Sequence, residues 1–346
     1  MSSLELPSRS LAQVIIQASI CPALNVISTV GNVLVCLAVY KNPKLRSNTN
    51  LYIIALAASD LLCGTVEMPL ASAVLITARW NLGDVVCQLQ GFLDVFVTNS
   101  TPATMGLSAL NRYIRIVKTN HYNKVFSPRK CKVWLSFVWL SLALYLLIGR
   151  LTTWCTFEFI PGYAVCSVAF TTSENRIIHY CVMSGLFFVL PFSIGLFSSC
   201  KIFLKIHQHE VDVASPCTLS YVASGFLFCW ILPGAFLFWK RFSPDTAPRI
   251  VQLTVVFLIY LSSTINPFIY AARHRVFRKE FRKLLCWWKE KRAISLADSG
   301  ANRKRGHGEK TPESATPFTE SLFSLPVDGK DRDQRNPENE VAETDL

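Results

Sequence analysis

The sequence predicts an all-α membrane protein, a seven-transmembrane helix bundle followed by a short amphipathic eighth helix. Hydrophobic residues make up 51% of the 346 residues and charged residues only 17%, whereas soluble domains carry about 25% charged residues. The apolar residues also gather in blocks of about twenty, the length at which a helix crosses a bilayer. Basic residues gather between alternate blocks, as they do at one face of a membrane protein.

Seven blocks meet the length requirement. They cover about 20–40, 50–76, 85–117, 132–152, 177–206, 215–239 and 249–272. The third and fifth blocks are more polar, and their Ser, Thr, Asn and Asp side chains indicate a bundle interior rather than lipid contact. We expect four regions: an extracellular N-terminus at 1–19, the bundle at 20–273, a membrane-surface helix at 274–288 and a disordered cytoplasmic tail at 289–346.

The lysines and arginines predict the orientation of the bundle. If the N-terminus is outside, eighteen basic residues lie at the cytoplasmic edge of the spans and seven lie at the outer edge. This asymmetry favours an extracellular N-terminus and a cytoplasmic C-terminus. The formal net charge of +12 therefore reflects the orientation of the spans, and its basic residues form a belt that faces the membrane. We expect no nucleic-acid partner.

The segment after the seventh span is amphipathic. Its apolar face is formed by Val276, Phe277, Phe281, Leu284 and Leu285, with basic residues opposite. Such a helix lies on the inner leaflet and contacts membrane lipids. Cys286 at its end is either a palmitoylation site or an unmodified interfacial cysteine.

The tail has few apolar residues and cannot bury enough surface to offset its ordering entropy. It ends in Thr344, Asp345 and Leu346. These three residues have the form of a peptide that adds a strand to a PDZ domain, so a PDZ-domain protein is an expected partner.

Characteristic residues recur at set places along the spans. They are Gly31-Asn32, Leu56–Asp60, Asn111-Arg112-Tyr113, Trp139, Pro191 and Asn266–Tyr270, with Cys87 and Cys166 at the outer side. This pattern, over about 20–288, resembles the rhodopsin-like (class A) G-protein-coupled receptors. The resemblance implies a plasma-membrane receptor that converts binding of an extracellular small molecule into activation of a heterotrimeric G protein. It also implies arrestin as a partner, a disulfide between Cys87 and Cys166, and no enzymatic activity.

Some stretches are similar to the melatonin receptors. They are Trp80–Gly83, Gly91–Leu93, Asn111 and His121-Tyr122 with Lys124. Two positions differ, because melatonin receptors carry a histidine where this chain has Phe187 and an alanine where it has Pro267. The similarity therefore indicates kinship within the fold and leaves an indole-like ligand as an alternative.

A predicted ligand site lies around Asp94, two helical turns and about 10 Å below Cys87. Amine receptors resemble this chain there, because their aspartate pairs with the ligand ammonium, and Tyr260 matches their partner tyrosine. A buried carboxylate requires a cation. Glu67 offers a second acid to the same region, and the remaining candidates are Ser184, Phe187 and Trp230.

Asp94 also has a structural interpretation. In this interpretation the Asp94 carboxylate forms either a salt bridge to Arg150, Arg176 or Arg249, or a hydrogen bond within the bundle. The fifth span also gives little support to an amine site, since it offers only Ser184 near the expected pocket and Phe187 is apolar.

The resemblance implies that the switch to the G protein uses Arg112, which meets the G protein when the sixth span swings outward. The other switch candidates are Asn111, Tyr113, Asn266, Pro267 and Tyr270. Asn111 stands where relatives carry an acid and forms no ion pair with Arg112. We therefore hypothesise a raised basal activity.

Asp60 would be an ionised group at mid-membrane, which costs about 2.5–3.5 kcal/mol unless it is compensated. By resemblance its neighbours are Asn32, Thr101, Ser263 and Asn266. Two interpretations stay open, a sodium site and a hydrogen-bond hub. No other cofactor is expected, and retinal is excluded because Tyr260 stands in place of the lysine that forms the Schiff base.

Two departures from the family pattern bear on signalling. Trp230 and Pro233 are separated by two residues rather than one, which rotates the Trp230 side chain by about 100°. Pro191 and Pro233 are only 42 residues apart, so either coupling is altered or a segment of sequence is missing. A non-signalling membrane scaffold and, less favoured, a transporter are the alternative functions.

Overall fold

The computed structural model describes residues 4–208, 229–236, 238–239 and 247–286. The chain divides into a first unit, Met1–Phe281, and a second unit, Arg282–Leu346. Several predicted features lie outside the described residues. They are the connection between the fifth and sixth spans, the start of the sixth span, the tail at 289–346 and the terminal residues Thr344, Asp345 and Leu346.

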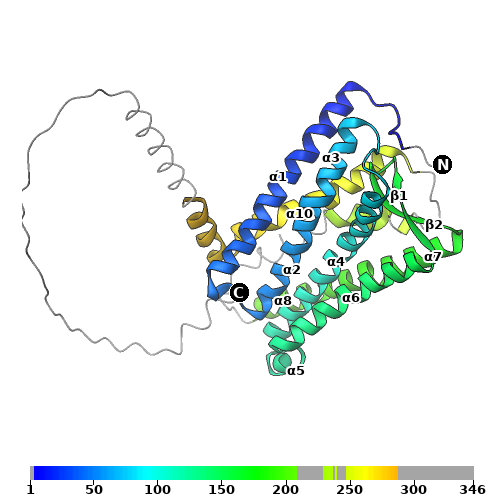
Figure 1. The fold of residues 1–346 in the computed structure, drawn as a ribbon. Helices are drawn as coiled ribbons and strands as arrows, with labels where there is room; N and C mark the ends of the chain where they lie inside the picture. Colours follow the sequence, from blue (N-terminus) through cyan, green and yellow to red (C-terminus); the bar gives the residue numbers. More distant parts are fainter. Residues whose placement is uncertain (1–3, 209–228, 237, 240–246, 287–346) are drawn as a thin grey trace, which may run out of the picture. The chain divides into compact units, whose positions relative to one another are not determined.

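The first unit consists mainly of long helices (Figure 1). Its first half contains α1 (Leu11–Lys41), η1 (Pro43–Leu45), α2 (Asn48–Leu62), η2 (Cys63–Glu67), α3 (Met68–Thr77) and α4 (Asp84–Val117). Its second half contains η3 (Thr119–His121), α5 (Tyr122–Val125), α6 (Pro128–Leu151), β1 (Cys155–Ile160), β2 (Val165–Phe170), α7 (Ser173–Val182), η4 (Met183–Val189), α8 (Leu190–Gln208) and α10 (Arg249–Arg273). Residues 229–236, 238–239 and 275–286 are also helical, and Cys286 is exposed at the end of the last stretch.

Five helical stretches of the described chain are long and apolar enough to cross a membrane. They are Leu11–Lys41, Asn48–Thr77, Pro128–Leu151, Ser173–Lys205 and Arg249–Ala272, and they coincide with the predicted first, second, fourth, fifth and seventh spans. The third predicted span is α4, whose 34 residues extend about 51 Å at 1.5 Å per residue. It is more polar than the others, as the sequence indicated.

The first helix begins at Leu11 rather than near residue 20. Ser10 and Gln13 form a capping box, in which the Gln13 N–H donates to Ser10 Oγ at 3.3 Å and the Ser10 N–H donates to Gln13 Oε1 at 3.1 Å. These bonds satisfy backbone groups that a helix otherwise leaves unpaired, so the helix starts there. Before it, the Leu6 N–H bonds to the Ala78 carbonyl at 2.7 Å.

Two spans contain a π-helical turn directly before a proline. In η2 the Met68 N–H reaches the Cys63 carbonyl, and Pro69 follows. In η4 the Leu190 N–H reaches the Gly185 carbonyl, and Pro191 follows. Proline has no N–H for the carbonyl four residues earlier, and the wider turn accommodates the mismatch. In contrast, α4 continues without interruption through Pro102.

The outer loop after α6 forms a β-hairpin, which the sequence analysis did not predict. β1 and β2 pair antiparallel, with Phe159 opposite Cys166 and Glu158 opposite Ser167. β2 packs on α4, and a disulfide joins Cys166 to Cys87 with their Cα atoms 5.3 Å apart. The predicted disulfide is confirmed, and Cys155 is a free, buried thiol.

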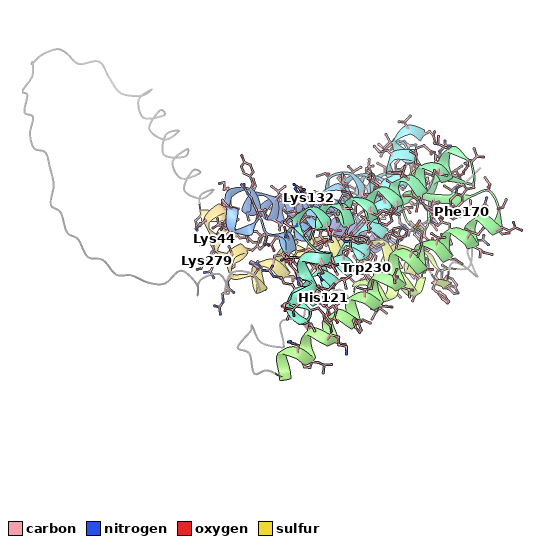
Figure 2. The ribbon with its side chains drawn as sticks, turned by 90° about the horizontal axis from the view of Figure 1, so that it is seen from below. Lys44, His121, Lys132, Phe170, Trp230 and Lys279 are labelled. Atoms are coloured by element: carbon pink, nitrogen blue, oxygen red, sulfur yellow. A yellow bond between two sulfur atoms is a disulfide. The ribbon has the colours of Figure 1, made fainter. Side chains whose placement is uncertain are left out.

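The hairpin and two of the lysines labelled in Figure 2 lie at opposite ends of the first unit. The hairpin lies where α1 begins, which we call the hairpin end, and α5 lies at the other end (Figure 1). Lys44 and Lys279 lie at the end opposite to Phe170 of β2 (Figure 2). These two lysines of the basic belt predicted from the sequence thus lie away from the hairpin.

Candidate functional site

The carboxylate of Asp94 is tied to the hairpin. Ser167 Oγ of β2 donates a 2.6 Å hydrogen bond to Asp94 Oδ2 of α4. Ser167 follows Cys166, whose disulfide to Cys87 fixes β2 against α4, and the Cys166 N–H donates to Gln90 Oε1 at 2.9 Å. The disulfide therefore sets the register that brings this hydroxyl to Asp94.

None of the three arginines considered from the sequence forms an ion pair with Asp94 in the described part of the chain. Arg150 Nε donates to Gln88 Oε1 at 3.0 Å. Arg176 Nε and Arg249 Nε are buried without a hydrogen-bond partner among the described residues. Among the described residues Asp94 therefore has no ion pair, and its hydrogen bond comes from Ser167 of the hairpin and not from another helix of the bundle.

Glu67 and Tyr260 are buried in the bundle, and the part-buried Asp94 lies on an adjoining helix, because η2 packs against both α4 and α10. The exposed fractions of Glu67 and Tyr260 are 2% and 3%, and the Tyr260 hydroxyl interacts electrostatically with both carboxylates. Both carboxylate oxygens of Glu67 lack a hydrogen-bond partner among the described residues, and so does the Tyr260 hydroxyl. Three of the predicted ligand-site residues are thus brought together from η2, α4 and α10.

The other three predicted ligand-site residues have different surroundings. Ser184 Oγ donates to the Tyr180 carbonyl within its own helical stretch, and Phe187 packs against the main apolar core. The Trp230 ring, labelled in Figure 2, is 1% exposed and lies 6.3 Å from the Phe188 ring centroid. No described contact joins these three side chains to Asp94.

Two residues near Asp94 were missed by sequence reasoning. In the sequence, Ser167 is marked only by its neighbour Cys166. No sequence feature marks Tyr163, which lies in the hairpin turn. Burial raises the pKa of the Tyr163 hydroxyl, and the charges of Tyr180 and Asp94 raise it further. Tyr163 is therefore a neutral phenol at the outer side of Asp94.

The polar core around Asp60 contains most of the predicted members. Asn266 Nδ2 donates to Asp60 Oδ2 at 2.8 Å, and Asn32 Nδ2 donates to the Ser263 carbonyl at 3.1 Å. Asp60 Oδ1 and Asn32 Oδ1 are buried and accept no hydrogen bond from the described residues. Thr101 is buried on α4, and no described contact joins it to Asp60. Two orphaned oxygens in one interior region are suited to a hard cation such as sodium.

A cavity of about 140 Å³ lies between α2, α4, α8 and α10 and borders the polar core at Asn266. Its lining includes Arg112 of α4 with Asn266 and Tyr270 of α10. The Tyr113 ring packs on the Phe197 ring at 5.5 Å between centroids. The structure thus brings Arg112 to two of the three predicted switch residues of α10, Asn266 and Tyr270.

Asn111 is bonded away from its neighbour Arg112. Thr49 Oγ1 donates to Asn111 Oδ1 at 3.2 Å, and Asn111 Nδ2 donates to Tyr122 Oη at 3.4 Å and to Cys131 Sγ at 3.8 Å. Asn111 therefore joins α4 to α2, α5 and α6.

A helical membrane bundle, an outer disulfide to a hairpin and a cavity lined by an arginine and a tyrosine are typical of one class of protein, the seven-transmembrane receptors. The sequence model of the family "7 transmembrane receptor (rhodopsin family)" matches residues 31–270. The chain belongs to this family and is a class A G-protein-coupled receptor, a multi-pass protein of the plasma membrane and not an enzyme.

Known receptors align with most of the chain. The human histamine H2 receptor is 28% identical over 281 residues, which cover 75% of this chain and 76% of that receptor. The sheep melatonin receptor type 1A is 29% identical over 278 residues, 75% of this chain and 74% of the receptor. The Drosophila melanogaster octopamine receptor beta-1R is 24% identical over 322 residues, 80% of this chain and 63% of the receptor. The predicted resemblance to both amine and melatonin receptors agrees with these relatives.

Proposed function

We propose that this receptor binds an extracellular cationic amine on Asp94 and responds by activating a heterotrimeric G protein. The observation that carries the proposal is the environment of Asp94. Its carboxylate is held by the Ser167 hydroxyl and has no ion pair with a described residue. An ionised carboxylate in this position is stabilised by an ammonium group, which supplies the missing charge and further hydrogen bonds. The similarity to histamine and octopamine receptors supports an amine.

The remaining ligand-site candidates have supporting roles. Glu67 and Tyr260 share the interior with Asp94. Ser184, Phe187 and Trp230 act as part of the wall on the side of the fifth and sixth spans, as the resemblance implies. Phe187 is partly buried against the apolar core and Trp230 is buried, so we expect them to shape the site rather than pair with a charge.

A second candidate ligand is an indole of the melatonin type. It is supported by the 29% identity to melatonin receptor type 1A and by Asn111, which the sequence shares with that group. An uncharged indole forms no ion pair with the carboxylate of Asp94. Removal of this carboxylate should therefore weaken the response to an amine and leave the response to an indole unchanged.

The proposed orientation places the hairpin end outside the cell. A disulfide forms in an oxidising compartment, and the Cys87–Cys166 bond lies at the hairpin end. Lys44 lies at the opposite end (Figure 2), as the positive-inside rule requires of a cytoplasmic face. The N-terminus is then extracellular and the C-terminus cytoplasmic.

Signal transfer is proposed to run from the ligand to the cavity at the cytoplasmic end. Binding biases a two-state bundle according to its differential affinity for the active state. Arg112 would meet the G protein, and Tyr113, Asn266, Pro267 and Tyr270 would support the change in helix packing. Asn111 leaves Arg112 without a carboxylate neighbour, which favours ligand-free activity.

A sodium ion is proposed at Asp60, with Asn32, Ser263 and Asn266 around it and Thr101 nearby. The orphaned Asp60 Oδ1 and Asn32 Oδ1 support it. The alternative is a hydrogen-bond hub, which Asn266 already forms in part. Agonist affinity measured in sodium and in N-methylglucamine buffers separates them, because only a sodium site makes the affinity of the wild type, and not of Asp60→Asn, depend on the cation.

Further partners are proposed at the cytoplasmic side. The amphipathic segment that contains the exposed Cys286 would contact membrane lipids and carry palmitate, and Thr344, Asp345 and Leu346 would bind a PDZ-domain protein. Arrestin is expected from the family. The competing functions are a non-signalling scaffold, which keeps the PDZ partner, and a transporter.

The experiment is a G-protein activation assay on the full-length receptor in cells with a panel of histamine, octopamine, melatonin, lipids and peptides. An amine that activates at micromolar concentration or below supports the proposal. Activation by melatonin alone favours the indole, and no activation with no basal output favours the scaffold.

A further inference from the structure

We propose that the ligand carries two positive charges, and that Asp94 pairs with one cationic group and Glu67 with the other. Because Asp94 is taken as the amine acceptor, this proposal rests on the proposed function. It adds the ligand class, a diamine or an amine with a second basic nitrogen, and makes Glu67 the residue that selects it.

The position of Glu67 follows from the π turn of η2. The Met68 N–H bonds to the Cys63 carbonyl five residues back, so the turn holds an additional residue compared with a regular helix. Glu67 is the last residue of this turn and is 2% exposed. A carboxylate in a membrane-spanning segment faces the bundle interior and marks a functional site by default.

The polar groups around Glu67 have no partners within the described chain. Both Glu67 carboxylate oxygens and the Tyr260 hydroxyl are buried and lack hydrogen bonds to the described residues. The turn that carries Glu67 packs against α4, which carries Asp94, and against α10, which carries Tyr260. Buried polar groups are nearly always hydrogen-bonded, so a donor-rich ligand group fits beside Glu67.

Four arginines of the outer region lie in the part of the chain that the structure describes and form no ion pair with Glu67 there. Arg9 Nη1 donates to the Leu75 carbonyl at 2.8 Å, and Arg150 Nε donates to Gln88. Neither Arg176 nor Arg249 forms an ion pair with Glu67 in the part of the chain that the structure describes. The protein thus supplies two neighbouring acids and no described counter-charge for either.

Electrostatics then favours two cationic groups over one. Glu67 and Asp94 interact with each other, and like charges repel more strongly in a low-dielectric interior than in water. One ammonium on Asp94 balances one charge and leaves Glu67 without a counter-charge, so that Glu67 either stays ionised at a high cost or takes up a proton. A second basic nitrogen of the same ligand balances Glu67 and donates to its unpaired oxygens.

The test uses the full-length receptor in cells with G-protein activation as the readout and surface level measured in parallel. The probes are linear diamines from diaminopropane to diaminohexane and monoamines of the same carbon number. The variants are Glu67→Gln, Glu67→Asp and Asp94→Asn, with Glu158→Gln on the exposed face of β1 as a matched control.

Diamines should exceed monoamines of equal length in the wild type by about tenfold or more in potency. Glu67→Gln should remove this preference, so that diamines and monoamines of equal length become about equally potent. Glu67→Asp should keep the preference and shift the optimum to a longer diamine, because the shorter side chain moves the carboxylate back. A merely structural Glu67 would not change the length optimum.

The outcomes separate this proposal from the proposed function. Equal potency of diamines and monoamines in the wild type, or a diamine preference that survives in Glu67→Gln at equal surface level, overturns the dicationic ligand. If Asp94→Asn still abolishes the response in that case, the amine site stands. No activation of the wild type by any amine overturns both. If Glu67→Gln fails to reach the surface, the length optimum of Glu67→Asp decides.

Discussion

Thr49 of α2 donates a 3.2 Å hydrogen bond to Asn111 of α4 through its hydroxyl, and the same oxygen accepts a 3.0 Å bond from Arg115 Nη1. Asn111 therefore belongs to a hydrogen-bond network between α2 and α4, and its neutral amide forms no ion pair with Arg112. A carboxylate at this position would add a negative charge beside both arginines.

We expect Asn111→Asp to lower ligand-free signalling. An added ion pair of about 1 kcal/mol shifts a two-state equilibrium about fivefold toward the resting state. The measurement is basal G-protein activation normalised to surface level. Thr49→Ala serves as a control, since it removes a partner of Asn111 without adding charge. Unchanged basal output in Asn111→Asp would sink the hypothesis.

We expect Gly31→Ala to destabilise the bundle. A Cβ atom at Gly31 would lie 2.8 Å from Pro267 Cγ of α10, and overpacking of this kind costs about 1–3 kcal/mol. The thermal midpoint of the detergent-solubilised receptor should fall. Gly185→Ala is the matched control, because nothing lies within 4 Å of a Cβ there. Equal midpoints for both variants would show that α1 and α10 do not pack this closely.

Loss of the hydroxyl in Ser167→Ala should weaken the response to an activating amine by about tenfold, or 1.4 kcal/mol. Ser167 Oγ is the group that fixes Asp94 Oδ2, and a carboxylate that is free to rotate binds an ammonium less well. Concentration–response curves for Ser167→Ala and for the conservative Ser167→Thr are the measurement. Full potency in Ser167→Ala would mean that the hairpin does not position Asp94.

The spans and the family could be predicted from the sequence because they depend on local composition and on motifs at fixed spacing. The apolar blocks coincide with five of the long helices, and the Cys87–Cys166 bond matches its expected partners. The start of α1 was misplaced, because hydropathy measures the apolar core whereas Ser10 and Gln13 decide where the helix begins.

The hairpin and the π turns could not be predicted in the same way. The pairing of β1 with β2 depends on how the disulfide sets them against α4, which is a long-range relationship. Prolines at 69 and 191 are visible in the sequence, yet Pro102 lies in an uninterrupted helix, so a proline alone does not reveal a π turn. Ser184 and Phe187 were proposed from the sequence because of their place in the fifth span and the resemblance to known receptors, whereas Ser167 and Tyr163 could be recognised only once the hairpin was known.

Removal of the charge at Asp94 tests the central claim most directly. Concentration–response curves for G-protein activation by an amine agonist are compared between the wild type, Asp94→Asn and the control Glu158→Gln at equal surface level. We predict that Asp94→Asn lowers amine potency by at least about a hundredfold, or 2.7 kcal/mol, and that Glu158→Gln has no effect. Retained amine potency in Asp94→Asn would contradict the account.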